Sequence, residues 1–92
     1  MRRPPRHVVV FTRRNCGLCR QAEELVAELA SRQTEVALVD VDADDDLLRR
    51  YHMRVPVIEV DGVEVAAAPV DPAVVRAAMR GRRGFWSRRP PS

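Results

Sequence analysis

Cysteine is scarce in this sequence, and its scarcity excludes one class of small protein. Only two cysteines occur among 92 residues, so the chain cannot rely on a disulfide framework to support a fold that lacks a core. Hydrophobic residues make up 46% of the chain, which is enough for one small domain with a single core. We therefore predict a domain that is stabilised mainly by packing.

Long hydrophobic runs are also missing. The apolar run that begins at Val8 has four residues and is soon followed by Arg13 and Arg14, so it is far too short for a signal-peptide core or a membrane span. We expect a cytoplasmic protein with no membrane partner. In that reducing compartment, two neighbouring cysteines serve catalysis or metal binding more often than structure.

Lysine is absent, and the arginines are unevenly distributed. Residues 1–6 carry three arginines and residues 81–92 carry four, with no acidic residue in either segment, whereas residues 7–80 carry nine arginines and all thirteen acids. We predict a basic N-terminal arm (1–6), a mildly acidic domain (7–80) and a basic, flexible C-terminal tail (81–92). Charged termini are ordinarily solvated, so we expect no nucleic-acid partner.

Several catalytic arrangements are missing as well: the sequence shows no carboxylate pair, no setting for a nucleophilic serine and no phosphate-binding glycine loop. What it does contain is a pair of cysteines between a strand and a helix. The apolar run Val8–Phe11 predicts a buried strand, and apolar residues recur at helical spacing from Leu18 onward. Cys16 therefore lies at or just before a helix start, and Cys19 lies in its first turn.

The remaining patterns give the order of the elements. A second apolar run, Val36–Val39, predicts another buried strand, and Asp44–Asp46 precede a short helix as capping residues. Asp61-Gly62 predicts a hairpin turn, and Asp71-Pro72 begin a last helix that ends at Gly81. The order is β-α-β-α-β-β-α. The first two strands should lie parallel, which predicts an α/β fold with a four-stranded mixed sheet flanked by three helices.

These residues resemble the glutaredoxins. The resemblance rests on Phe11-Thr12-Arg13 at the end of a hydrophobic strand, on Cys16-Gly17-Leu18-Cys19, and on Val55-Pro56 about forty residues later. The T-R-x-x-C-x-L-C form is most similar to a bacterial glutaredoxin-like family. The resemblance covers about residues 7–80 and implies a thioredoxin-like fold and the activity of a thiol-disulfide oxidoreductase.

The position of the cysteines suits this chemistry. The thiolate is the nucleophile in disulfide exchange, and a helix start lowers the pKa of a cysteine placed there. We predict that Cys16 attacks a substrate disulfide and that Cys19 resolves the mixed disulfide. By the resemblance, Arg13 stands where glutaredoxins carry a lysine near the thiolate, and an arginine there keeps the charge and can bind a substrate carboxylate.

The resemblance also implies a role for a proline. In this fold the peptide bond before Pro56 is cis, Pro56 faces the cysteines, and the backbone of Val55 binds an extended substrate segment. The alternative is that Pro56 merely opens a strand, where its missing N–H costs nothing.

The chain departs from glutaredoxins that bind glutathione. Those proteins usually carry two glycines and an aspartate before the last helix, whereas this chain has Ala66-Ala67, and its Asp71 is expected to cap a helix. We expect no tightly bound cofactor, with glutathione or an equivalent low-molecular-weight thiol as a candidate co-substrate. The expected partner is a protein or small-molecule disulfide, and the expected state is a monomer.

Two other classes of function remain open at this point. A non-catalytic module with a thioredoxin fold would bind a partner without using its cysteines. A metal site could combine Cys16, Cys19, His7 and His52, but these histidines lie outside the usual spacing of a zinc finger, so we expect no metal.

Overall fold

The computed structural model describes residues 6–80. The elements in chain order are β1 (Arg6–Thr12), α1 (Gly17–Leu29), β2 (Thr34–Asp40), the 3₁₀ turn η1 (Val41–Ala43), α2 (Asp45–Tyr51), β3 (Val57–Val60), β4 (Val63–Ala67) and α3 (Pro72–Arg80). This confirms the predicted order β-α-β-α-β-β-α, to which the structure adds η1 between β2 and α2.

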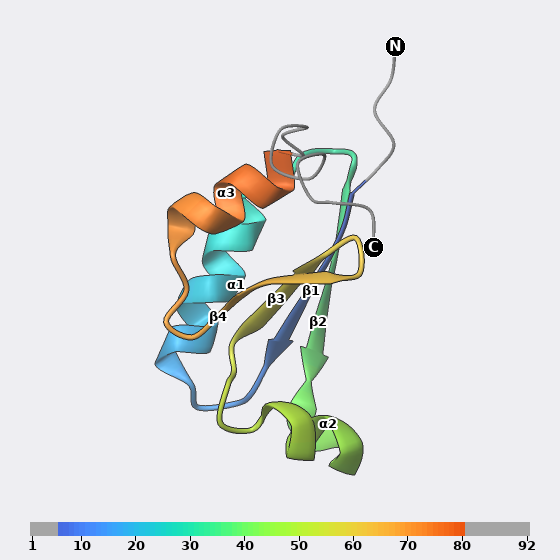
Figure 1. Ribbon diagram of the computed structural model, residues 1–92, viewed down its shortest axis with the longest axis vertical. Helices are drawn as coiled ribbons and strands as arrows, with labels where there is room; N and C mark the ends of the chain where they lie inside the picture. Colours follow the sequence, from blue (N-terminus) through green and yellow to red (C-terminus); the bar gives the residue numbers. More distant parts are fainter. Residues whose placement is uncertain (1–5, 81–92) are drawn as a thin grey trace, which may run out of the picture.

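The four strands form one mixed sheet in the order β2-β1-β3-β4 (Figure 1). β1 and β2 are parallel, as predicted, whereas β3 lies antiparallel to both β1 and β4. Because the parallel strands end at the same edge of the sheet, the segments that follow β1 and β2 are brought together there.

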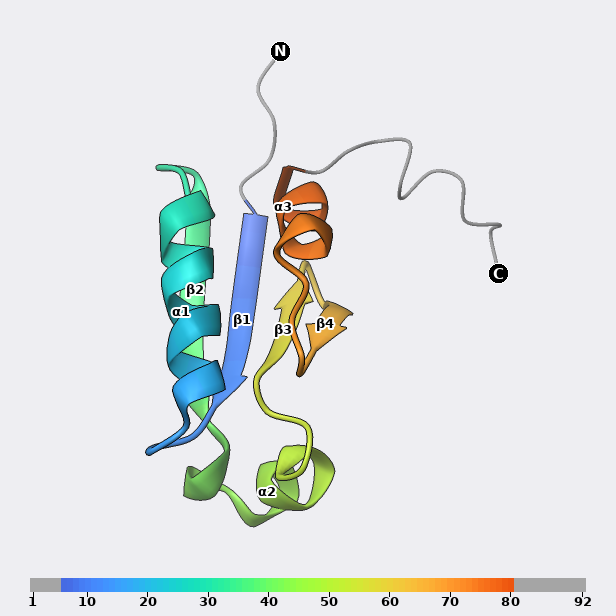
Figure 2. The ribbon, with the colours of Figure 1, turned by 90° about the vertical axis from the view of Figure 1, so that its left-hand side faces the viewer.

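Two helices cover one face of the sheet. α1 and α3 both pack on this face (Figure 2), and the core beneath them joins Val10 of β1 and Ile58 of β3 to Val26 of α1 and Val75 of α3. All four side chains are fully buried. Removing this apolar surface from water is the main force that fixes α1, and with it the cysteines, on the sheet.

α2 packs on the opposite face, near the edge where β1 and β2 end (Figure 1). Its Tyr51 stacks on Phe11 of β1, with ring centroids 4.5 Å apart and an interplanar angle of 22°. Val57 of β3 is fully buried in the same cluster. This second core holds the segment after β2 against the end of β1.

The prediction of a buried second strand is wrong. β2 is an outer strand of the sheet, and its Val36 and Leu38 are 40% and 55% exposed. The core beneath α1 and α3 takes its strand residues from β1, β3 and β4. Four apolar residues in a row therefore indicated a strand correctly, but the run could not show that one side of the strand lacks a neighbour.

The predicted turn and caps are confirmed. Asp61 and Gly62 join β3 to β4 with φ angles of 51° and 84°, the left-handed conformation that an Asp-Gly hairpin turn requires. Asp44 accepts N–H bonds from Asp46 and Leu47 at the start of α2. Asp71 accepts one from Ala73 at the start of α3. Helix capping thus accounts for the presence of Asp44 and Asp71 at these positions.

The predicted flexibility of the tail 81–92, and most of the N-terminal arm, lie outside the described residues. Among the helices of residues 6–80, none has both the length and the apolar character to cross a membrane.

Candidate redox site

The two cysteines lie together at the start of α1. The structure joins Cys16 and Cys19 in a disulfide, with their Cα atoms 5.2 Å apart, inside the range that a disulfide allows. Asn15, with a φ of 55°, turns the chain between β1 and α1; asparagine is one of the residues that tolerate this left-handed conformation. The prediction that Cys16 lies just before the helix and Cys19 in its first turn is therefore confirmed.

The two sulfurs have different surroundings. Cys16 is the N-cap residue of α1 and is only partly buried, whereas Cys19 is completely buried. The backbone N–H of Cys19 donates to the sulfur of Cys16 across 3.1 Å. This N–H bond and the helix dipole both favour negative charge on the Cys16 sulfur once the disulfide is reduced.

Arg13, expected near the thiolate, lies in the same cleft as Cys16 but has an acidic partner. Its Nε and one terminal nitrogen contact the two carboxylate oxygens of Asp42 at 3.2 and 3.1 Å. Asp42 follows β2 as Arg13 follows β1, and Thr12 and Asp40 are paired in register. Sequence reasoning missed Asp42, although the parallel pairing of the two strands could have indicated its position.

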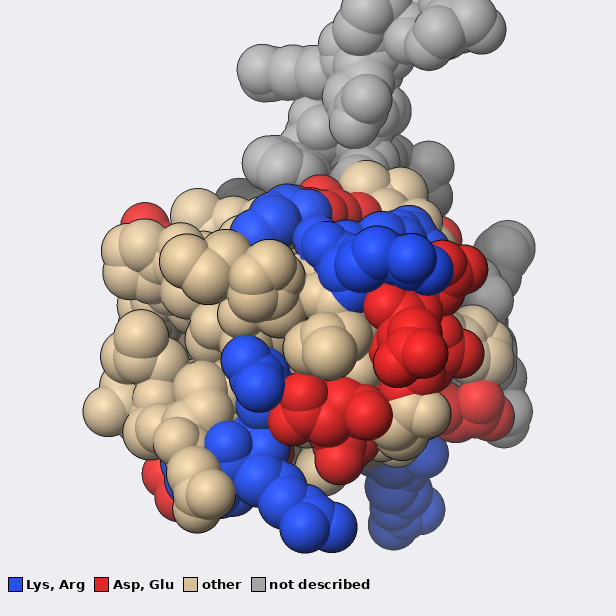
Figure 3. Space-filling model, turned by 90° about the horizontal axis from the view of Figure 1, so that it is seen from below, with Lys and Arg blue, Asp and Glu red and all other residues tan. Residues whose placement is uncertain are grey.

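A cleft of about 650 Å³ opens beside Cys16. We call it the polar cleft, and its lining residues are Arg13, Arg14, Asn15, Cys16, Asp42, His52 and Val55. Seen from this end of the molecule (Figure 3), acidic and basic side chains lie next to one another at the centre and right, whereas the left of the view is mostly uncharged. The polar cleft is therefore suited to a substrate that carries charged or hydrogen-bonding groups.

A second, smaller cleft of about 240 Å³ lies between α1 and the segment before α3. We call it the apolar cleft; it is lined by Leu18, Gln21, Ala22, Leu25, Pro56, Pro69, Val70 and Pro72. Leu18, from between the cysteines, is 52% exposed. Leu18 therefore presents apolar surface next to the cysteine pair.

Val55 and Pro56 lie between these two clefts. Val55 lines the polar cleft, Pro56 lines the apolar cleft, and the peptide bond between them is cis, as the resemblance implied. Pro56 also stands immediately before β3, so it occupies the strand-opening position as well. A second cis bond, Ala68–Pro69, precedes α3.

The four-ligand metal site is not assembled. His7 pairs with Glu35 at 2.9 Å at the start of β1, while Cys16 lies beyond the end of that strand. His52 alone of the two histidines lines the polar cleft. Within residues 6–80, no group of three or more histidine, cysteine or acidic side chains is placed to hold a metal ion.

The alanines at the expected glycine positions belong to the sheet. Ala66 and Ala67 are the last residues of β4 and pair with Ile58 and Val57 of β3. The segment from Ala68 to Asp71 then leads into α3. In this chain the backbone at the two alanines is engaged in strand pairing, and Asp71 is engaged as a cap.

Known proteins share this arrangement. A family model described as "Glutaredoxin-like domain (DUF836)" matches residues 7–80. Protein XcR50 from X. campestris is 32% identical with a TM-score of 0.67, over 79% of this chain and 95% of that one. Protein Ne2328 from Nitrosomonas europaea is 29% identical with a TM-score of 0.65, over 85% and 95%.

More distant structures show the fold alone. Mitochondrial thioredoxin 3 from Saccharomyces cerevisiae, in its oxidised form, is 18% identical with a TM-score of 0.62, over 85% of this chain and 79% of that one. None of the curated proteins matches the chain. The fold is thus thioredoxin-like, and with a family match that spans residues 7–80 the chain belongs to the glutaredoxin-like domain family.

Proposed function

We propose that this chain is a thiol-disulfide oxidoreductase in which Cys16 is the nucleophile and Cys19 the resolving thiol. The observation that carries the proposal is the asymmetry of the pair. Cys16 is partly exposed at a helix start and receives an N–H bond, whereas Cys19 is buried one turn further on, within bonding distance. Only the first sulfur can meet an incoming disulfide without unfolding of the helix.

The reaction proceeds by two exchanges. The Cys16 thiolate attacks one sulfur of the substrate disulfide, so a bond forms between Cys16 and that sulfur while the other sulfur leaves as a thiolate and takes up a proton. The Cys19 thiolate then attacks the Cys16 sulfur and releases the second substrate thiol. Two electrons pass from the protein dithiol to the substrate, and the protein is left with the Cys16–Cys19 disulfide.

The two clefts define how a substrate would lie. An extended segment that follows Val55 and Pro56 would cross from the polar to the apolar cleft and pass Cys16. Asp42 binds two nitrogens of Arg13, so Arg13 keeps one terminal nitrogen for a substrate carboxylate. Arg14 forms no ion pair with an acidic residue within residues 6–80 and adds a second cation in the same cleft.

The electrons must be restored by an external thiol. The glutaredoxin-like fold fits a protein without a tightly bound cofactor, so we propose that glutathione or an equivalent low-molecular-weight thiol reduces the disulfide in the cytoplasm. The substrate is a protein or small-molecule disulfide that reaches Cys16 through the polar cleft.

Single-cysteine variants test the proposal. The reduced protein is mixed with hydroxyethyl disulfide, and adducts are identified by mass spectrometry. We expect the parent chain to release mercaptoethanol and end with the Cys16–Cys19 disulfide, Cys19→Ser to keep a stable mixed disulfide on Cys16, and Cys16→Ser to give neither product. Release of mercaptoethanol that survives Cys16→Ser would exclude the assigned nucleophile, and a parent chain that does not react would favour a binding module.

A further inference from the structure

A separate cavity lies at the end of the molecule opposite the cysteines. It has a volume of about 360 Å³, and its lining comes from the start of β1, the end of α1 with the turn into β2, and the end of α3. In Figure 2 the start of β1 and the ends of α1 and α3 lie at the same end of the molecule. We call it the arginine pocket. Three arginines and three uncharged polar residues contribute to its lining: Arg6, Arg76, Arg80, Ser31, Gln33 and Thr34. Within the described chain, no acidic residue belongs to this lining.

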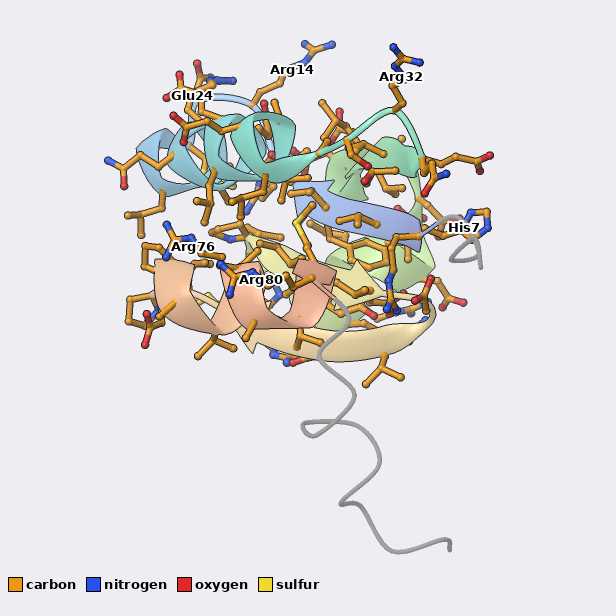
Figure 4. All side chains as sticks on the ribbon, turned by 90° about the horizontal axis from the view of Figure 1, so that it is seen from above. His7, Arg14, Glu24, Arg32, Arg76 and Arg80 are labelled. Carbon is orange, nitrogen blue, oxygen red and sulfur yellow. A yellow bond between two sulfur atoms is a disulfide. The ribbon has the colours of Figure 1, made fainter. Side chains whose placement is uncertain are left out.

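The positive charge of the pocket is only partly compensated. Arg6 donates through one terminal nitrogen to Asp61 at 2.6 Å, and no carboxylate within residues 6–80 forms an ion pair with Arg76. Figure 4 shows that the side chains of Arg76 and Arg80 project from α3 toward α1. An anion that enters the pocket is attracted most strongly by Arg76, whose charge has no carboxylate partner within residues 6–80.

The polar side chains between α1 and the start of β2 add neutral donors. The N–H of Ser31 donates to the Thr34 hydroxyl at 3.0 Å, and the N–H of Gln33 donates to the Ser31 hydroxyl at 3.2 Å. The two hydroxyl oxygens lie 3.2 Å apart. One hydroxyl proton is therefore used between them, and the other is left to donate to a ligand oxygen.

We propose that the arginine pocket binds a small molecule that carries a phosphate or diphosphate group. Guanidinium groups match the geometry of phosphate oxygens with paired N–H donors. The volume falls in the range of about 300–1,000 Å³ that small-ligand sites occupy. Leu29 and Met79 complete the lining and provide apolar contact for the rest of an organic phosphate. This binding site is independent of the redox chemistry.

Calorimetric titration of the full chain at low ionic strength tests the proposal, with inorganic pyrophosphate, adenosine diphosphate and adenosine as probes. We expect saturable binding of both diphosphates to one site and none of adenosine. Tighter binding of the nucleotide identifies an organic phosphate as the ligand, whereas equal affinities identify the phosphate groups alone.

Two arginine variants distinguish binding at the arginine pocket from general electrostatic attraction to surface arginines. Arg76→Gln removes charged hydrogen bonds and should weaken diphosphate binding roughly tenfold or more. Arg20→Gln removes a cation from α1 that is also exposed but lies outside the pocket and should leave binding unchanged. Equal losses in both variants, or no saturable binding, would overturn the proposal. Binding of a single-stranded oligonucleotide without binding of pyrophosphate would also overturn it, in favour of a nucleic-acid surface.

Discussion

The contact between Arg13 and Asp42 leads to the sharpest prediction about the redox site. Asp42 uses both carboxylate oxygens, one for the Nε of Arg13 and one for a terminal nitrogen. Asp42→Asn keeps the size of the side chain but removes its charge and one of the two acceptors. The net charge of the polar cleft beside Cys16 then rises by one unit.

The size of the expected loss of stability follows from how exposed the Arg13–Asp42 ion pair is. The side chains of Arg13 and Asp42 are 37% and 38% exposed, so solvent screens much of their attraction. Exposed ion pairs contribute about 0.2–1 kcal/mol, and a two-point contact lies in the upper part of that range. We expect Asp42→Asn to lower the free energy of unfolding by about 0.5–1 kcal/mol, which lowers the Tm of a domain of this size by about 2–8 °C.

The effect on reactivity is measured with two disulfides of different charge. The reduced protein reacts with 5,5′-dithiobis(2-nitrobenzoate), which is anionic, and with 2,2′-dithiodipyridine, which is neutral. We expect Asp42→Asn to raise the ratio of the two rate constants, anionic over neutral, by about two- to fivefold at low ionic strength. Added salt should reduce this gain, because it screens exposed charges.

Asp46→Asn is the matched control. Asp46 pairs with Arg49 at 3.2 Å, and both side chains are more than 70% exposed and absent from the lining of the polar cleft. Its ratio of rate constants should stay close to that of the parent chain. If Asp42→Asn leaves the ratio unchanged, or if both variants change it equally, then Asp42 does not control the charge that a substrate meets at Cys16.

Three further predictions concern the fold and the cysteines. Burial raises the pKa of Asp61, but the N–H of His7 and the side chain of Arg6 together lower it by more, so the pKa lies below its ordinary value of 3.8. The stability that this carboxylate adds is present above pH 3.8 and is lost as the pH falls through the lower folded value. The difference in Tm between the parent chain and Asp61→Asn should therefore shrink in acid, and a difference that stays constant from pH 7 to pH 2 would contradict this. Val26→Ala should lower the free energy of unfolding, measured with a denaturant, by about 2 kcal/mol because Val26 is fully buried. Val36→Ala, on the exposed strand β2, should lower it by less than half as much. Equal losses would contradict the difference in burial between these two residues. Iodoacetamide should modify Cys16 of the reduced chain far faster than the buried Cys19, as peptide mapping can show, and equal rates would mean that the first turn of α1 opens freely.

The cysteine pair could be predicted from the sequence because its geometry is local. A strand, a short turn and a helix bring Cys16 and Cys19 together through spacing alone, and the structure places their Cα atoms 5.2 Å apart. The cis bond before Pro56 is a different case: the resemblance implied it, and the structure confirms it. The roles proposed for Arg13, Val55 and Pro56 stay predictions.

Other features depended on contacts between distant segments. Asp42 stands 29 residues from Arg13, and only the parallel pairing of β1 with β2 brings the two together. The same pairing places β2 at the outside of the sheet, which explains why Val36 and Leu38 are exposed although their sequence is as apolar as that of β1. The strand pairing of Ala66 and Ala67 likewise depends on β3.

The amino-acid sequence by itself therefore determined the order of the elements, the hairpin turn, the helix caps and the position of the cysteine pair at a helix start. Each of these depends on backbone preferences and side-chain spacing over a few residues. Only the tertiary structure decided which strand lies at the edge, which acid faces Arg13, and which arginines surround the pocket at the opposite end. The physical reason is that these features arise where the packing of apolar faces brings remote parts of the chain side by side, and local preferences carry no information about which faces meet.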